Sequence, residues 1–412
     1  MNTEESRSRY RFVIEALLVV ALASQTLTWL APAPLLSPII KDLHIHLGEA
    51  GLIISVIALC IAIFSLAGAV VAEKLGALRA LILGLWLLAI GGIGSGYAPN
   101  IVLLLLCRVV EGIGFGVMIA PPATMVMQWF NENEWPYMNT INAVAPFVGL
   151  TAAFALTGPV YLALGSQWKT VLLVYGLFVA TVAVLWTILG RSAPGHAQVA
   201  GHGGGGSLGE VLAMRDVRLV AIALFSGMWV FQLYSAFLPQ FFQTVRGMSL
   251  ERAGSLTALL PLAGVFAAAG GGVLSGMVGL RRPFTYPIQA LLGLGCLGCV
   301  LFTDINAIRL SLIVLGIGSS AGLSTIFTLM MELPGMTPTK AGTGLGVVWG
   351  AGYAGAFLSP FLCGALAGKF GLTAVMLGSL AFMIIAVGGF YLVPETGRGR
   401  MRLQEAAAQH VD

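Results

Sequence analysis

Long runs of apolar residues recur along the whole chain. A helix needs about 20 apolar residues to cross the roughly 30 Å hydrocarbon layer of a membrane. Strands of a membrane barrel would be about 10 residues long and would alternate in polarity, whereas these runs are longer and continuous. The pattern therefore predicts an all-α polytopic membrane protein with 12 transmembrane helices. The predicted segments are 12–40, 48–72, 78–97, 101–128, 138–164, 168–190, 217–243, 252–278, 284–303, 307–331, 341–368 and 371–393.

The composition excludes the soluble classes of protein. The 412 residues are 58% hydrophobic and only 9% charged, against roughly 25% charged residues in soluble domains. So few charges cannot cover a soluble globule, which excludes a soluble enzyme, a nucleic-acid-binding protein and a disordered protein. The sequence has no Walker motif and no polar catalytic cluster near a membrane interface. We therefore expect no enzyme activity, no catalytic residues and no cofactor.

All five cysteines lie inside apolar runs, and all five histidines lie outside them. Cysteines in such runs are typical small buried hydrophobic residues. Cys296 and Cys299 form a Cys-x-x-Cys pair, but no second pair and no suitably spaced histidine follows. We therefore expect no metal site and no proton relay through histidine.

Basic residues are distributed unequally between the two sides of the predicted spans. Lys and Arg are more than twice as frequent in the loops on one side as in those on the other, and cytoplasmic loops carry such an excess. The bias predicts that both termini are cytoplasmic in a multi-pass protein of a plasma membrane or cell inner membrane. The first apolar run, 12–40, is too long for the core of a cleavable signal peptide.

The longest loop separates the sixth and seventh segments and contains the glycine-rich stretch 201–207, which is typical of a flexible linker. The sequences on its two sides resemble each other. Gly51, Gly68 and Gly76 recur 203 residues later, and the Gly-Ile-Gly sequence at 112–114 recurs after 204 residues. We therefore predict two pseudo-symmetric six-helix bundles. The expected divisions are an N-terminal bundle (1–190), a cytoplasmic linker (191–216) and a C-terminal bundle with a short basic tail (217–412).

The loop between the second and third segments, 68–79, resembles the Gly-x-x-x-Asp-Arg/Lys-x-Gly-Arg loop of the major facilitator superfamily. Glu73 takes the place of the Asp, and Lys74 takes the place of the first basic residue. The match is partial, because Ala69 stands at the first Gly position. The resemblance implies 12 helices in two bundles, with Glu73, Lys74 and Arg79 at an inner gate. The alternative is ordinary positive charge on a cytoplasmic loop.

The fourth segment contains Arg108 and Glu111, the two charged residues that lie well inside a predicted span. The sequence from Arg108 to Gly112 resembles the superfamily's Arg-x-x-x-Gly motif. Charges at this depth cost several kcal/mol unless they face a cavity or a partner, and their i, i+3 spacing allows them to pair. Arg108 is therefore either a substrate anchor or half of a self-satisfied ion pair, and Glu111 is a candidate proton-coupling residue. Antiporters of the family usually carry an acid in the middle of helix one, whereas the nearest acid here is Glu15, at the inner edge.

Neutral polar residues also lie inside the spans. The resemblance implies that helices 1, 4, 7 and 10 line a central cavity. For each such residue the alternative is a contact that only holds helices together. The residues that we predict to bind substrate together with Arg108 are Gln25, Trp29, Asn142, Gln232, Tyr234, Ser320 and Tyr353.

The stretch 325–346 resembles the helix 10–11 loop of the cyanate, nitrate and organic-anion branches. The nitrate branch has an Arg in the middle of helices two and eight, which this chain lacks, so nitrate and nitrite are excluded. The sequence predicts a secondary active transporter that moves a small polar or anionic solute, an organic acid or an inorganic monoanion, by alternating access. From the family we expect proton coupling and a monomer in the lipid bilayer. The alternative is a drug/proton antiporter that exports lipophilic compounds.

Overall fold

The computed structural model describes residues 3–131, 134–192 and 208–397. These residues form α-helices, one short 3-10 helix and connecting loops, without any strand in the described ranges. The helices are α1 (Thr3–Leu30), α2 (Leu36–Leu43), α3 (Leu47–Leu75), α4 (Ala77–Tyr97), α5 (Ile101–Val117), α6 (Pro121–Trp129), α7 (Trp135–Ala163), α8 (Trp168–Leu189), α9 (Leu208–Ala213), α10 (Arg215–Thr244), α11 (Leu250–Thr257), α12 (Leu259–Val278), η1 (Arg282–Phe284), α13 (Tyr286–Leu301), α14 (Ile305–Ser320), α15 (Leu323–Glu332), α16 (Pro338–Phe370), α17 (Leu372–Ser379) and α18 (Ala381–Leu392).

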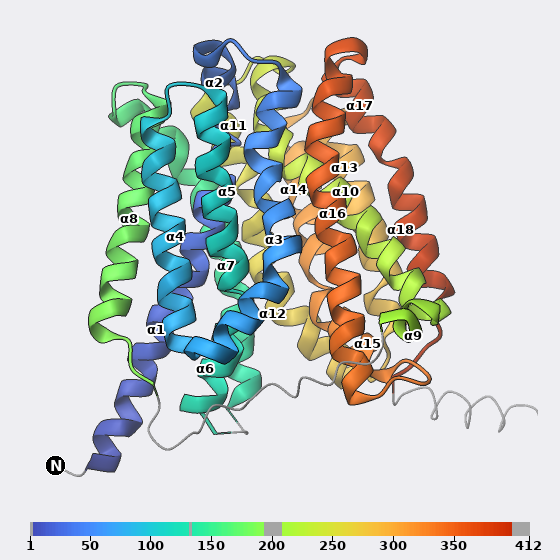
Figure 1. Cartoon of the computed structure of the whole chain (residues 1–412). Coiled ribbons are helices and arrows are strands. Elements are labelled where there is room, and N and C mark those ends of the chain that lie inside the picture. Colours follow the sequence, from blue (N-terminus) through green and yellow to red (C-terminus); the bar gives the residue numbers. More distant parts are fainter. Residues whose placement is uncertain (1–2, 132–133, 193–207, 398–412) are drawn as a thin grey trace, which may run out of the picture.

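Within the described ranges, twelve helical stretches are long and apolar enough to cross a membrane, which confirms the predicted all-α polytopic fold. The long helices run between two ends of the molecule (Figure 1). One end carries the start of α1 together with α6 and α9, and we call it the N face. The other end carries α2 and the start of α17, and we call it the α2 face. Many large apolar side chains, such as Ile90, Phe266 and Ile384, are more than half exposed, as a lipid-facing surface requires.

The first predicted segment, 12–40, is divided in the structure, because prolines interrupt its hydrogen bonding. α1 ends at Leu30, and α2 begins at Leu36. Pro32 and Pro34 lie between them and have no backbone N–H to donate. The fourth segment is divided in the same way, since Pro121 and Pro122 open α6 directly after α5.

The glycines that recur along the sequence make equivalent helix contacts. Gly68 faces the backbone of Val117. Gly271, which is 203 residues after Gly68, faces the backbone of Ala321, which is 204 residues after Val117. Gly112 likewise faces Ile57 and Cys60, whereas Gly316 faces Leu260 and Ala263. Small residues let helix backbones approach closely. The sequence repeat is therefore a repeat of helix packing.

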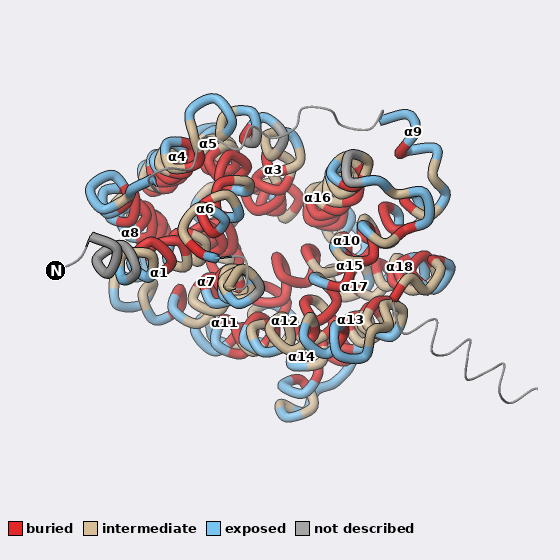
Figure 2. Tube along the Cα trace, turned by 90° about the horizontal axis from the view of Figure 1, so that it is seen from below, coloured by how far each residue is buried: buried red, intermediate tan, exposed pale blue. Residues whose placement is uncertain are grey.

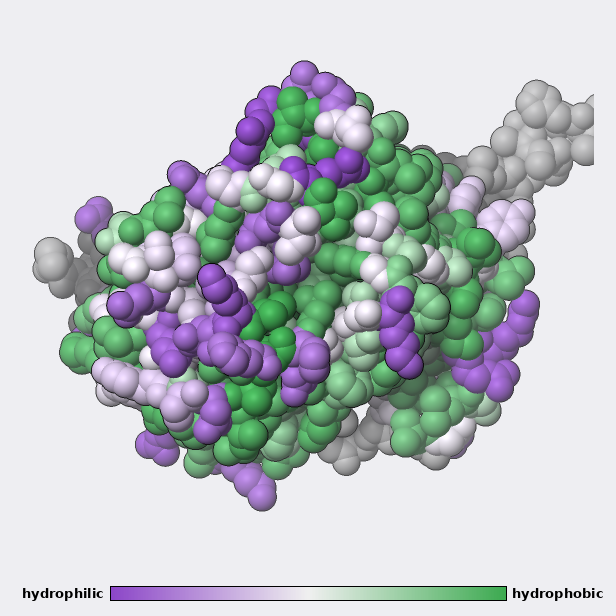
Figure 3. All heavy atoms as spheres, turned by 90° about the horizontal axis from the view of Figure 1, so that it is seen from above, coloured by the Kyte–Doolittle hydropathy of each residue, from purple (hydrophilic) through white to green (hydrophobic). Residues whose placement is uncertain are grey.

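Helices before residue 190 and helices after residue 208 meet along two seams. In one seam α3 packs against α16, where Gly51 faces the Pro360 carbonyl. In the other α7 packs against α11, where Gly254 faces the Phe154 carbonyl. Both close approaches lie near the α2 face, at the first turns of α3 and α11. Hydrophilic residues gather on that face (Figure 3), and buried residues lie on the inward sides of the helices (Figure 2).

Candidate functional site

Arg108 and Glu111 form an ion pair in the middle of the membrane-spanning helices. The distance from Arg108 Nη1 to Glu111 Oε2 is 2.7 Å, and each side chain is only 1% exposed. The two residues lie one turn apart on α5, so the i, i+3 spacing directs them to the same helix face. Ser95 Oγ, on α4, donates to the other carboxylate oxygen of Glu111 at 3.0 Å.

The remaining donors of Arg108 are bound to backbone carbonyls of α1 and α3. Nη1 also donates to Thr28 O at 3.0 Å, Nη2 donates to Trp29 O at 2.6 Å, and Nε donates to Ile53 O at 2.9 Å. Thr28 O is free because its helical partner would be the missing N–H of Pro32. Trp29 O is free because the next donor, the Ala33 N–H, bonds Leu30 O instead. Arg108 therefore satisfies carbonyls that the end of α1 leaves without helical partners.

A small pocket with about 10 Å³ of free space lies beside the ion pair, which is room for at most one water molecule. Its wall includes Thr28, Gly92 and Tyr175 in addition to the two charged residues. All of these residues belong to the first half of the chain, and every described hydrogen bond of Arg108 stays within that half. In this conformation the geometry favours the interpretation of Arg108 and Glu111 as a mutually satisfied pair. A direct contact between Arg108 and substrate stays a prediction.

The predicted substrate-binding residues divide into two groups. Trp29, Tyr234 and Ser320 make hydrogen bonds to backbone carbonyls of other helices: Ile54 O at 2.9 Å, Met376 O at 3.1 Å and Gly264 O at 3.1 Å, respectively. These contacts hold helices together, which is the alternative that the sequence allows. The second group offers polar atoms that are still available for a ligand.

In this second group, the amide nitrogens of Gln25 and Gln232 and both amide atoms of Asn142 are buried without a partner in the described part of the chain. Tyr353 is half-buried, and its ring lies 6.1 Å from the ring of Trp349. Buried polar atoms without partners are uncommon in folded proteins, so Gln25, Gln232 and Asn142 are the members of the predicted set that best fit ligand contact.

The predicted inner gate is not engaged in this conformation. Glu73, Lys74 and Arg79 are exposed around the α3–α4 loop, and no ion pair of theirs occurs among the described residues.

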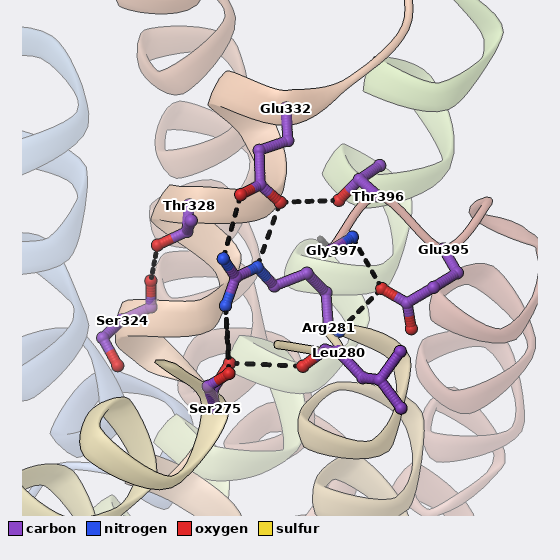
Figure 4. A network of polar contacts seen from close by, with 9 residues as sticks. All are labelled: Ser275, Leu280, Arg281, Ser324, Thr328, Glu332, Glu395, Thr396 and Gly397. Atoms are coloured by element: carbon purple, nitrogen blue, oxygen red, sulfur yellow. Dashed lines mark hydrogen bonds and ion pairs between the residues drawn. The ribbon is translucent and has the colours of Figure 1, made fainter. Parts of the chain in front are cut away.

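The corresponding α12–α13 loop carries a polar network that sequence reasoning missed (Figure 4). Arg281 binds both carboxylate oxygens of Glu332, with donor–acceptor distances of 2.9 and 3.0 Å. The bonded carboxylate raises the pKa of Arg281 above its ordinary value. Glu395 accepts the backbone N–H groups of Arg281 and Arg282 at 2.7 and 2.9 Å. Glu332 is the last residue of α15, and Glu395 lies in the segment after α18, so the loop sequence alone gives no signal for them.

Glu15 is the second feature that the sequence left without a role. Its side chain is 6% exposed, and neither carboxylate oxygen has a hydrogen bond of good geometry in the described residues. It lies close to Asn142 on α7. The apolar run in which it stands is the available sequence signal, since an acid inside a span is expected to be functional.

Comparisons with known proteins agree with this architecture. The family model of the Major Facilitator Superfamily matches residues 17–360. A hexuronate transporter of Bacillus subtilis (strain 168) is 26% identical over 258 residues, which cover 59% of each chain. A gallate transporter of Pseudomonas putida is 25% identical and covers 74% of each chain. A probable sulfoacetate transporter, SauU, of Cupriavidus necator is 25% identical; the match covers 58% of this chain and 59% of the relative.

Among solved structures, the chain resembles a bacterial homologue of the human lysosomal transporter Spinster in an inward-facing, unoccupied conformation. The TM-score is 0.79 at 16% identity, and the match covers 93% of this chain and 97% of the other. This likeness concerns the fold. The chain spans about six tenths of the hexuronate and sulfoacetate transporters that it matches. With a family model that covers most of its length, the chain belongs to the major facilitator superfamily.

Proposed function

We propose that the protein carries a small organic anion across the membrane by alternating access, coupled to the movement of a proton. The observation that carries the proposal is the ion pair of Arg108 and Glu111, buried in mid-membrane beside a pocket. The names of the relatives support the choice of substrate class, because they are transporters of hexuronate, sulfoacetate and gallate. All three solutes are acids.

The pair provides a physical basis for coupling. As long as Glu111 is ionised, its charge cancels that of Arg108, and the pocket beside them offers an anion no net attraction. A proton on Glu111 would leave the Arg108 charge uncompensated, and the organic anion would then restore neutrality. A charge buried at this depth is costly without a partner. Proton and anion therefore favour each other's binding, which is the thermodynamic requirement for symport.

The contacts between the two halves support one particular conformation. The described hydrogen bonds that join them are Ser37 Oγ to Gln240 Oε1 at 2.7 Å and Gln243 Nε2 to Pro34 O at 2.9 Å, both near the α2 face. Near the N face, the described ion pairs stay within one half. If both termini are cytoplasmic, as the charge distribution predicts, these contacts support a conformation that is closed on the outer side. Residues 1–190 and 217–412 would rock about the two seams, connected by the linker 191–216.

Uptake into proteoliposomes tests the proposal. The probes are radiolabelled galacturonate, sulfoacetate and gallate, supplied with and without an inward proton gradient. We expect the wild-type protein to accumulate at least one acid only when the gradient is present. Glu111→Gln cannot exchange a proton, so this variant should equilibrate the acid without accumulating it.

Two results would contradict the proposal. If Glu111→Gln accumulated the acid at the wild-type level when the gradient is present, Glu111 would have no role in proton coupling. Proton-driven efflux of a lipophilic cation such as tetraphenylphosphonium, with no uptake of any acid, would identify a drug/proton antiporter instead.

A further inference from the structure

A second pocket lies in the other half of the molecule, between α10, α13 and the junction of α14 with α15. Its free space is about 20 Å³, which is room for one small group of the size of a water molecule. α13 forms its outer wall, while α10 and α15 lie nearer the middle of the molecule (Figure 2). Its lining contains Gln289 and Ser319 among apolar residues and glycines, and no charged residue. A pocket of this composition suits a neutral polar group.

The internal repeat shows why this pocket exists. Gln289, Ser319 and Gly322 correspond, 204 residues earlier, to Leu85, Phe115 and Met118. These three earlier side chains are buried, and the Met118 side chain lies directly against Gly84. The first half thus fills the space with three large apolar side chains. In the second half, a hydroxyl, an amide and a glycine at the same positions leave it open.

Gln289 is the polar group in this pocket that lacks a partner. Its side chain is 8% exposed, and its Oε1 atom has no hydrogen bond within the described residues. Oε1 points at Gly227, 2.7 Å from where a Cβ atom on that glycine would stand, and Gly227 also lines the pocket. A buried amide oxygen without a donor costs free energy. A leucine, as at position 85, would avoid that cost.

The available atoms define the chemistry of the missing group. Ser319 Oγ already donates to Gly316 O at 2.8 Å, so its lone pairs can only accept. Gln289 Oε1 also accepts. Two acceptors in an uncharged pocket require a neutral donor of hydrogen bonds, and a hydroxyl group is the smallest organic group of that kind.

We propose that this pocket binds hydroxyl groups of the transported acid, with Gln289 Oε1 and Ser319 Oγ as acceptors. The inference rests on the proposed function, because the acidic group of the same solute is assigned to the first half. In this proposal the charge of a hydroxylated acid is held by the first half, and a hydroxyl group of the same acid is held by Gln289 in the second half. An acid without hydroxyl groups leaves Gln289 unpaired.

Ligand-dependent thermal stability of the purified, full-length protein tests the subsite. The probes are gallate and galacturonate, their hydroxyl-free counterparts benzoate and tetrahydropyran-2-carboxylate, and the neutral compounds pyrogallol and galactose. We expect a hydroxylated acid to bind about tenfold more tightly than its counterpart, since one hydrogen bond is worth roughly this factor. Gln289→Leu should remove that preference, weaken the hydroxylated acid alone and leave the melting temperature without ligand unchanged or higher.

Two further variants separate pocket filling from general disturbance. Ser319→Phe installs the residue found at position 115 and should abolish the preference for hydroxyl groups as well. Gly276→Phe is the control, because a Cβ atom added at this exposed position of α12 meets no neighbouring atom within 4 Å. It should bind every probe as the wild-type protein does.

The outcomes distinguish this inference from the function on which it rests. The wild-type protein could bind an acid while Gln289→Leu weakens the binding of a hydroxylated acid and of its hydroxyl-free counterpart equally, or weakens neither. This result would contradict the hydroxyl subsite but not the proposal of anion transport. The wild-type protein could instead bind pyrogallol or galactose but no acid, and Gln289→Leu could lose that binding. This result would support the subsite and contradict the proposal that the solute is an organic anion. Absence of binding by all six probes would contradict both.

Discussion

At the scale of single residues, Arg108 has a structural role that its sequence motif does not reveal. Its depth in the membrane and its pairing with Glu111 follow from the sequence, because both charges stand inside one apolar run. Its bonds to Thr28 O and Trp29 O do not. They depend on the way in which Pro32 alters hydrogen bonding on a helix that is distant in sequence, and no local pattern on α5 contains that information.

Replacement of Arg108 by alanine should therefore destabilise the protein as well as stop transport. The change leaves Glu111 buried without a cation and removes donors from three carbonyls. Removing one partner of a buried ion pair lowers the stability of a protein by about 3–5 kcal/mol, so we expect a lower melting temperature in detergent.

The control for this prediction comes from the repeat, which has Leu312 and Leu315 at the equivalent positions. The double variant Arg108→Leu, Glu111→Leu should recover part of the lost stability while remaining inactive. A single Arg108→Ala variant as stable as the wild-type protein would show that these bonds contribute little.

At the scale of helices, the two seams explain why specific glycines recur. The repeat of Gly51 and Gly254 is visible in the sequence, whereas their partners on α16 and α7 are not, because a glycine pattern identifies a close approach without identifying the second helix. The structure shows that both glycines face backbone carbonyls of the opposite half. A side chain on either glycine would push the halves apart at the α2 face.

Gly51→Val should consequently open the α2 face. The added Cβ would stand 2.8 Å from the Pro360 carbonyl carbon, which is too close for the backbones to keep their positions. We expect faster maleimide labelling of Cys363, which is buried on α16 near this seam, as measured by mass spectrometry of its peptide. Gly368→Val, where an added Cβ atom would meet no neighbour within 4 Å, is the control and should leave the labelling rate unchanged.

The network around Arg281 predicts an asymmetry between the two corresponding loops. Arg281→Ala removes the two bonds to Glu332 and the contacts with Ser275, so it should loosen the junction of α12, α15 and the segment after α18. Faster proteolysis or amide exchange there would report the change. Arg79→Ala, at an exposed position of the equivalent first-half loop, should have no such effect. Equal sensitivity of the two loops would contradict this prediction.

At the scale of the whole molecule, the number of spans and the fold class could be predicted, because the length of an apolar run reports directly on membrane crossing. The pocket at Gln289 could not. It arises from three positions, on α13, on α14 and in the turn before α15, at which the repeat exchanges large apolar residues for small or polar ones. Such a site becomes visible only when both halves are compared in space.

The charge asymmetry predicts the orientation of the molecule in the membrane, and this prediction is directly testable. The predicted cytoplasmic loops carry most of the Lys and Arg residues. A green fluorescent protein fused after residue 412 should fluoresce when the protein is produced in Escherichia coli, while alkaline phosphatase fused there should be inactive. The alkaline phosphatase fusion should become active when the junction is moved to the α1–α3 connection. The reverse pattern would place the termini outside.

The bonds between Arg108 and the end of α1 also bear on how the protein is assembled during synthesis. Insertion of a span with two charges into a bilayer is unfavourable, with a free-energy cost of about 2.5–3.5 kcal/mol for each charge. The acceptors for Arg108 lie on α1 and α3, which leave the ribosome before α5. Each new helix thus finds its polar partners already in the membrane. A nascent chain that lacks the first two spans should therefore insert its remaining spans into the membrane poorly. The order of the helices along the chain would then help to determine how the protein folds.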